Sequence, residues 1–170
     1  MSTATMSRGR RRGGVHSVVH IRGFARIQMG ERDAHGHLRI VGDSGWTKNT
    51  VTNDGRNSYI AAQVGNVSGS KLVSHLQLAT QSTAVDATST ALVGETRVRK
   101  ALTASTLATG TLRMTASWSS TDNAAAITIG SIAVYNTSTA GAGTMGSGQS
   151  FTTSQWASNQ DLSATYEWRF

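Results

Sequence analysis

The chain carries its clearest hydrophobic pattern at the C-terminal end. Apolar residues stand there at every second position: Leu162, Ala164, Tyr166, Trp168 and Phe170. Successive side chains of a strand point to opposite faces of a sheet, so this spacing predicts a strand over 162–170 with one apolar face. Because its aromatic side chains share that face, we expect the strand to pack in the core or in an interface.

The same period of two recurs upstream. It predicts strands within 19–29, 38–41, 71–80, 95–106, 111–119 and 126–136. In the last of these ranges the apolar phase changes across Gly130 and Ser131, which indicates a β-bulge. Residues 141–148, rich in Gly, Ser and Thr, are expected to form a loop between strands.

One short helix interrupts this pattern. Tyr59, Ile60 and Val64 give a helical stripe within 56–64, and a turn signal at 53–55 (Asn-Asp-Gly) precedes it. Gly65 is expected to end the helix.

Together these patterns predict the fold class. Roughly eight strands with small-residue turns favour an all-β protein, an antiparallel β-sandwich similar to a jelly roll, with one short helix. The composition agrees, since 18 of the 170 residues are glycine and none is proline. The absence of cysteine excludes disulfides and cysteine-based metal sites. No apolar run approaches the ~20 residues of a membrane span, so no membrane partner is expected. The N-terminal residues are not followed by the apolar stretch of a secretory signal, so no such signal is expected either.

The positive charge of the chain is concentrated near its N-terminus. The net charge is +7, and residues 1–56 hold ten of the sixteen Lys and Arg residues against four of the nine Asp and Glu residues. Four arginines lie within residues 1–14: Arg8, Arg10, Arg11 and Arg12. This stretch has too little apolar surface to fold alone. We therefore expect a flexible basic arm at 1–14 and a single sandwich domain at 15–170. The arm either is solvated or contacts nucleic acid or an acidic partner.

No set of residues matches a catalytic site. The carboxylates are scattered, and the segment 42–45 (Gly-Asp-Ser-Gly) resembles the nucleophile surroundings of some serine proteases over four residues only. His35 and His37 could ligate a metal from one face of a strand. However, they lie between two predicted strands and flank Gly36, which favours an exposed hairpin turn. We therefore expect no catalytic residue, no cofactor, no metal and no small-molecule substrate.

Six short segments follow one another in a particular order. They are Lys-Asn-Thr-Val-Thr-Asn-Asp-Gly at 48–55, Ser-His-Leu-Gln-Leu-Ala-Thr at 74–80, Thr-Ala-Leu-Val-Gly-Glu-Thr-Arg at 90–97, Ile-Ala-Val-Tyr-Asn at 132–136, Gly-Ala-Gly-Thr-Met at 141–145 and Tyr-Glu-Trp-Arg-Phe at 166–170. Their order is similar to that of small modules in tail fibres, baseplates and related structural proteins of tailed bacteriophages. The chain departs from that family at 79–81, where Ala-Thr-Gln replaces Gly-Thr-Gly, and by a one-residue slip within 90–97. The basic arm and the first hairpin are not part of the shared pattern.

This resemblance implies a non-enzymatic structural protein of a bacteriophage virion, made in the host cytoplasm. Such a protein would assemble with copies of itself and with other virion proteins in the tail or a fibre adaptor, or decorate the capsid. Two alternatives stay open. One is a small jelly-roll capsid protein whose arginine-rich arm binds packaged nucleic acid, and the other is a glycan-binding β-sandwich for host attachment.

Large aromatic side chains are the expected anchors of an assembly interface. The candidates are Trp46, Trp118, Trp156, Trp168 and Phe170. For each tryptophan, packing in the core is the alternative.

Overall fold

The structure is a computed structural model, and it describes residues 20–107 and 110–170. The strands are β1 (Arg22–Arg32), β2 (Leu38–Asp43), β3 (Thr47–Val51), β4 (His75–Ala79), β5 (Glu95–Ala101), β6 (Thr103–Leu107), β7 (Thr111–Trp118), β8 (Ile127–Tyr135), β9 (Met145–Trp156) and β10 (Gln160–Arg169). The helix is π-helical over Gly55–Ala61 (η1) and α-helical over Ala62–Val64 (α1), and Ser120–Asp122 form a single 3-10 turn (η2). The predicted all-β fold with one short helix is confirmed.

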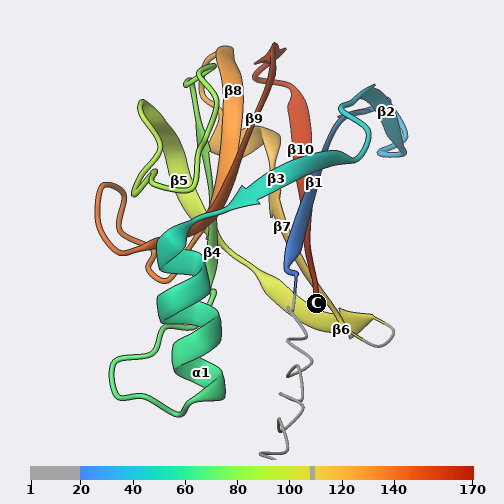
Figure 1. The fold of residues 1–170 in the computed structure, drawn as a ribbon. Helices are drawn as coiled ribbons and strands as arrows, with labels where there is room; N and C mark the ends of the chain where they lie inside the picture. Colours follow the sequence, from blue (N-terminus) through green and yellow to red (C-terminus); the bar gives the residue numbers. More distant parts are fainter. Residues whose placement is uncertain (1–19, 108–109) are drawn as a thin grey trace, which may run out of the picture.

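The strands form one antiparallel sheet (Figure 1). Its order is β5-β4-β8-β9-β3-β1-β10-β7-β6, and β2 pairs with β1. β3 joins the two halves of the sheet, because Thr47 to Asn49 pair with β1 whereas Thr50 and Val51 pair with β9. The halves face each other across a common core, which gives the sandwich-like arrangement that the sequence predicts.

A single stretch of chain supplies both outer edges of this sheet. β5 and β6 stand at opposite ends of the strand order, yet only Leu102 separates them in the sequence. At the seam, the Trp118 indole N–H donates to the Val98 carbonyl at 2.9 Å, and Lys100 Nζ donates to Asp122 Oδ1 at 2.6 Å. The sheet is therefore a nearly closed barrel, which removes most of the unpaired strand edge that an open sheet would expose.

The core is built from the alternating residues of facing strands. β10 contributes Leu162, Ala164, Tyr166 and Trp168, β7 contributes Met114, Ala116 and Trp118, and β8 contributes Ile129, Ile132 and Val134, all of them buried. The predicted bulge in β8 is confirmed by a shift in register between Ile129 and Ser131. A side chain at Gly130 would lie 2.6 Å from the Gln81 carbonyl oxygen, so close backbone packing explains the glycine.

Two predictions from the sequence are wrong in detail. Residues 141–148 are not a loop throughout, because β9 begins at Met145. Its first residues lack bulk because their neighbours fill the space: a Cβ at Gly146 would lie 3.3 Å from the Trp168 ring, and one at Gly148 would lie 2.9 Å from Val85. Leu72 is not a strand residue, since β4 begins at His75 and Leu72 is 70% exposed.

Candidate assembly surfaces

The structure divides the five aromatic residues proposed as interface anchors into two groups. Trp118, Trp156 and Trp168 are at most 2% exposed. Their indole N–H groups donate to Val98 O, Gln160 O and Ser147 Oγ, respectively. Because each polar N–H has an acceptor inside the protein, these three rings are core residues and present no surface to a partner. Trp46 and Phe170 are 42% and 52% exposed and still fit the interface prediction.

The arginines of the predicted arm, Arg8, Arg10, Arg11 and Arg12, lie outside the described residues. The surfaces discussed below are therefore built from the folded part of the chain alone.

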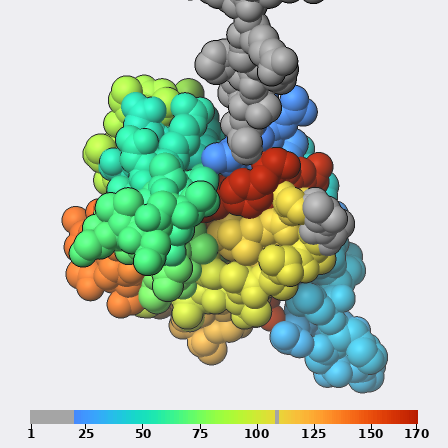
Figure 2. Space-filling model, turned by 60° about the horizontal axis from the view of Figure 1, so that its bottom comes forward, coloured from blue at the N-terminus to red at the C-terminus, as the bar shows by residue number. Residues whose placement is uncertain are grey.

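The first exposed apolar surface lies on the hairpin of β1 and β2. Within the described residues, β2 pairs on one side only, with β1, so that its other edge is open. Leu38, Ile40 and Val41 are 50%, 48% and 40% exposed. We call these three residues the hairpin surface. The hairpin projects from the body in Figures 1 and 2. An apolar strand with a free edge is a natural site for pairing with another chain.

A polar turn fixes the tip of this hairpin. Asp33 Oδ1 accepts hydrogen bonds from the backbone N–H groups of His35 and His37 at 2.8 and 2.9 Å. The hydrogen bond from the His37 backbone, and then that from His35, lower the pKa of the Asp33 carboxyl below its ordinary value. The predicted exposed turn is confirmed. The described residues contain no group of three or more possible metal ligands.

The second exposed apolar surface lies at the end of the helix and the C-terminus. Val64, Val67, Leu72 and Phe170 are 86%, 56%, 70% and 52% exposed, and we call them the helix surface. Three of them, Val64, Leu72 and Phe170, line a shallow groove of about 250 Å³ that Tyr59, Ile60, Leu112 and Trp168 also line. Figure 2 shows the helix and its following loop in green, next to the red C-terminal strand.

These two surfaces hold most of the exposed apolar bulk. In the part of the chain that the structure describes, ten large hydrophobic residues are exposed, and seven of them belong to the hairpin surface or the helix surface. The two surfaces lie at opposite ends of the molecule in both views (Figures 1 and 2). Scattered exposed hydrophobics need no explanation, but gathered ones mark sites of interaction.

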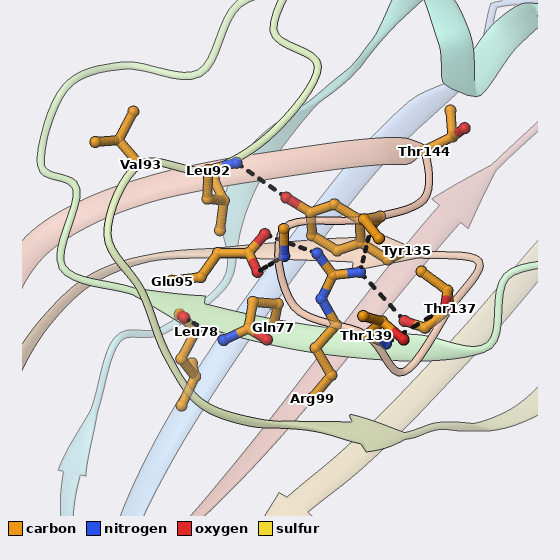
Figure 3. A network of polar contacts seen from close by, with 12 residues as sticks. Gln77, Leu78, Leu92, Val93, Glu95, Arg99, Tyr135, Thr137, Thr139 and Thr144 are labelled. Carbon is orange, nitrogen blue, oxygen red and sulfur yellow. Dashed lines mark hydrogen bonds and ion pairs between the residues drawn. The ribbon is translucent and has the colours of Figure 1, made fainter.

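A buried arginine of β5 contacts the loop between β8 and β9 (Figure 3). The Arg99 side chain is fully buried and its Nη2 donates to Glu95 Oε1 at 2.7 Å. The guanidinium stacks 3.6 Å above the centre of the Tyr135 ring. Its Nη1 donates to the carbonyls of Thr137 and Ala142 at 3.2 and 2.8 Å. These contacts hold the loop between β8 and β9 in place.

The Glu95–Arg99 pair depends on an irregular strand. Residues four apart in a regular strand lie about 13 Å apart, too far for an ion pair. Here Arg97 has a positive φ of 63°, and the pairing of β4 with β5 shifts register between Leu76 and Leu78. The bulge brings Glu95 and Arg99 together. The segment at 90–97 ends at Arg97 and departs from the family by one residue in spacing. This departure was the sign in the sequence that the strand leading to Arg99 is irregular.

The segments that carry the resemblance meet in space. Thr52, in the 48–55 segment, donates to the carbonyl of Met145 at 2.7 Å and accepts from the Gly55 N–H at 3.0 Å. Leu92 donates its N–H to the Tyr135 hydroxyl at 2.9 Å, and Glu95 Oε2 accepts from the Gly141 N–H at 3.0 Å. Their residues thus build the contacts between strands and loops.

The segment 42–45 also has a structural explanation. Asp43 forms an ion pair with Arg26, and Ser44 Oγ accepts from the Ile27 N–H at 2.9 Å while donating to the Gly45 carbonyl at 2.8 Å. The side-chain hydrogen bond from Arg26 strongly lowers the pKa of Asp43. Both side chains are therefore engaged in holding the turn between β2 and β3.

No family model, curated protein or solved structure matches the chain. Among the described residues, no helix has the length and apolarity needed to cross a membrane.

Proposed function

We propose that the protein is a non-enzymatic structural subunit of a bacteriophage virion that assembles with copies of itself. The observation that carries the proposal is the pair of apolar surfaces at opposite ends of a nearly closed barrel. The order of the six sequence segments supports the virion setting, in the tail, a fibre adaptor or a decorating position on the capsid, together with other virion proteins.

The two surfaces differ, and this difference favours a head-to-tail contact. The hairpin surface is a projecting strand, whereas the helix surface borders a shallow groove. When two different surfaces of one chain bind each other, each copy keeps one free surface for the next copy. Repetition of the contact closes a ring if the rotation permits, and otherwise gives a filament.

Single substitutions on either surface test this proposal. We expect the wild-type chain to form oligomers as its concentration rises, and Ile40→Lys and Leu72→Lys each to shift the protein toward the monomer. A lysine on the free edge of β2 opposes pairing, and one beside the groove places a charge in an apolar contact. Light scattering coupled to size exclusion measures the masses.

Val93→Lys is the matched control. Val93 is 72% exposed but belongs to neither surface, so this variant should assemble like the wild type. A wild-type chain that stays monomeric at every concentration contradicts the proposal, as does equal loss of assembly in all three variants.

A further inference from the structure

A third surface, separate from the two apolar ones, lies on the outer side of β3, β1, β10 and β7. Its cationic residues are Arg22, Arg26, Lys48, Arg113 and Arg169. Strand pairing sets them side by side: Lys48 lies opposite Phe24, Phe24 opposite Glu167, and Glu167 opposite Arg113. All of these side chains alternate with buried neighbours, so they point away from the core. We call this surface the basic face.

The carboxylates of this face are already neutralised. Glu167, whose side chain is 2% exposed, accepts hydrogen bonds from Arg113 and from Arg169. Burial alone would raise the pKa of Glu167, but the hydrogen bonds from Arg169 and Arg113 outweigh it and lower the pKa. Asp43 forms an ion pair with Arg26. Asp161, further along the same side of β10, pairs with Arg32. The five cations named above therefore face only two nearby carboxylates, Glu167 and Asp43, which leaves this part of the face positive.

Some of the positive charge lacks a counterion. Within residues 20–107 and 110–170, Arg22 and Lys48 have no ion pair, and both are exposed. Arg22 lies directly opposite Arg169 in the register of β1 and β10. Glu167 carries one negative charge and is shared by Arg113 and Arg169, so it offsets the repulsion between Arg22 and Arg169 only in part. A bound anion between Arg22 and Arg169 would relieve the rest.

The remaining groups on the face suit one class of polyanion. Trp46 is 42% exposed, and its ring lies 6.0 Å from the Arg113 guanidinium. Exposed hydroxyls of Ser163, Thr115 and Ser117 continue the same face. Arginine and hydroxyl groups bind phosphate oxygens, and an exposed aromatic ring can stack with an unpaired base. An acidic protein surface would use the cations but would give Trp46 no base to stack on.

We propose that the basic face binds a nucleic-acid strand, with Arg22, Lys48 and Arg169 contacting phosphates and Trp46 stacking on a base. The inference goes beyond assembly and does not depend on it, because neither apolar surface takes part.

The test uses the full chain with the arm neutralised by Arg8→Gln, Arg10→Gln, Arg11→Gln and Arg12→Gln. Fluorescence anisotropy with a labelled 30-nucleotide oligothymidine measures affinity over a series of salt concentrations. We expect binding that weakens with salt. Adding Arg22→Gln and Lys48→Gln should reduce the slope of log affinity against log salt by about 1.4, since two phosphate contacts are lost. The matched control, Arg56→Gln with Lys71→Gln, removes the same charge elsewhere and should leave the slope unchanged.

Tryptophan fluorescence tests the stacking. The other three tryptophans are buried, so the oligonucleotide should quench Trp46, and Trp46→Phe should abolish that quenching. Three results would each overturn the proposal. The first is that the chain with the neutralised arm does not bind the oligonucleotide, and the second is that the Arg22→Gln, Lys48→Gln variant and its control show equal salt slopes. The third is that polyglutamate competes as well as unlabelled oligonucleotide and neither quenches Trp46. Wild-type assembly is measured separately, so failure here is distinguishable from failure of the structural role.

Discussion

Glu95→Gln is expected to lower the free energy of unfolding by about 3–5 kcal/mol. The substitution keeps the shape of the side chain but removes the only carboxylate that pairs with Arg99 among the described residues. The Arg99 guanidinium is fully buried, so its charge would stay in a low-dielectric site without a partner. The contact of Glu95 with the Gly141 N–H would also weaken, which loosens the loop before β9.

Asp43→Asn is the matched control for this prediction. It also removes one acid from an ion pair with arginine, but Arg26 and Asp43 are about one-third exposed. Exposed pairs contribute about 0–1 kcal/mol, so the control should lose about 1 kcal/mol or less, although Asp43 also holds its turn. Denaturant unfolding, followed by tryptophan fluorescence in the Ile40→Lys background, measures both without a contribution from assembly. Losses of similar size in the two variants would show that the buried network does not stabilise the fold.

Gly55→Ala is expected to lower the free energy of unfolding by about 3 kcal/mol or more, or to prevent folding. A Cβ at this position would lie 1.8 Å from the Gly146 carbonyl oxygen and 2.8 Å from its carbon. Both partners are backbone, so neither can move without displacing the helix or β9. Thr52 reinforces this junction, because its hydroxyl contacts Gly55 N and the Met145 carbonyl.

Gly65→Ala, at the other end of the same helix, is the control for helix propensity. Gly65 has a φ of −80°, which any residue adopts. Its added Cβ would meet only Ala61 O at 3.2 Å and Val67 at 3.3 Å. We expect a loss of less than about 1 kcal/mol. If Gly55→Ala is tolerated as well as Gly65→Ala in thermal and denaturant unfolding, the contact between the helix and β9 is looser than described.

The sequence predicted those elements whose pattern is local. β7 and β10 alternate strictly between apolar and polar residues because one face is buried and the other is solvated. The phase change at Gly130 located the bulge in β8. The helix was also found, since its stripe and the following Gly65 lie close together in the chain.

Long-range packing explains what the sequence did not reveal. β9 has almost no apolar alternation at its start, because Trp168 and Val85 occupy the space beside Gly146 and Gly148. The alternation of β7 places Trp118 on the buried face. The acceptor of its indole N–H, the Val98 carbonyl, could not be predicted from that strand because it lies across the seam of the barrel. β5 and β6 follow each other in the chain but stand at opposite ends of the strand order, which is possible only because the sheet nearly closes on itself.

The candidate assembly surfaces could be predicted only in part, because they too depend on long-range packing. Trp46 and Phe170 were among the residues expected at an interface, and both are exposed. The sequence predicted an ordinary strand at Leu38, Ile40 and Val41. Their exposure could not be predicted, because it follows from the open edge of β2 and not from the pattern of the residues. The basic face depends on strand register, which places Arg113 of β7 opposite Glu167 of β10.

The central claim is that two different apolar surfaces join one copy of the chain to the next. The most direct test mixes the Ile40→Lys and Leu72→Lys variants and measures mass by light scattering. Each variant keeps one of the two surfaces intact, so a head-to-tail contact predicts a one-to-one dimer, about twice the 17.9 kDa of a single chain, that grows no further. A mixture that stays monomeric, at concentrations where the wild-type chain assembles, would contradict the claim.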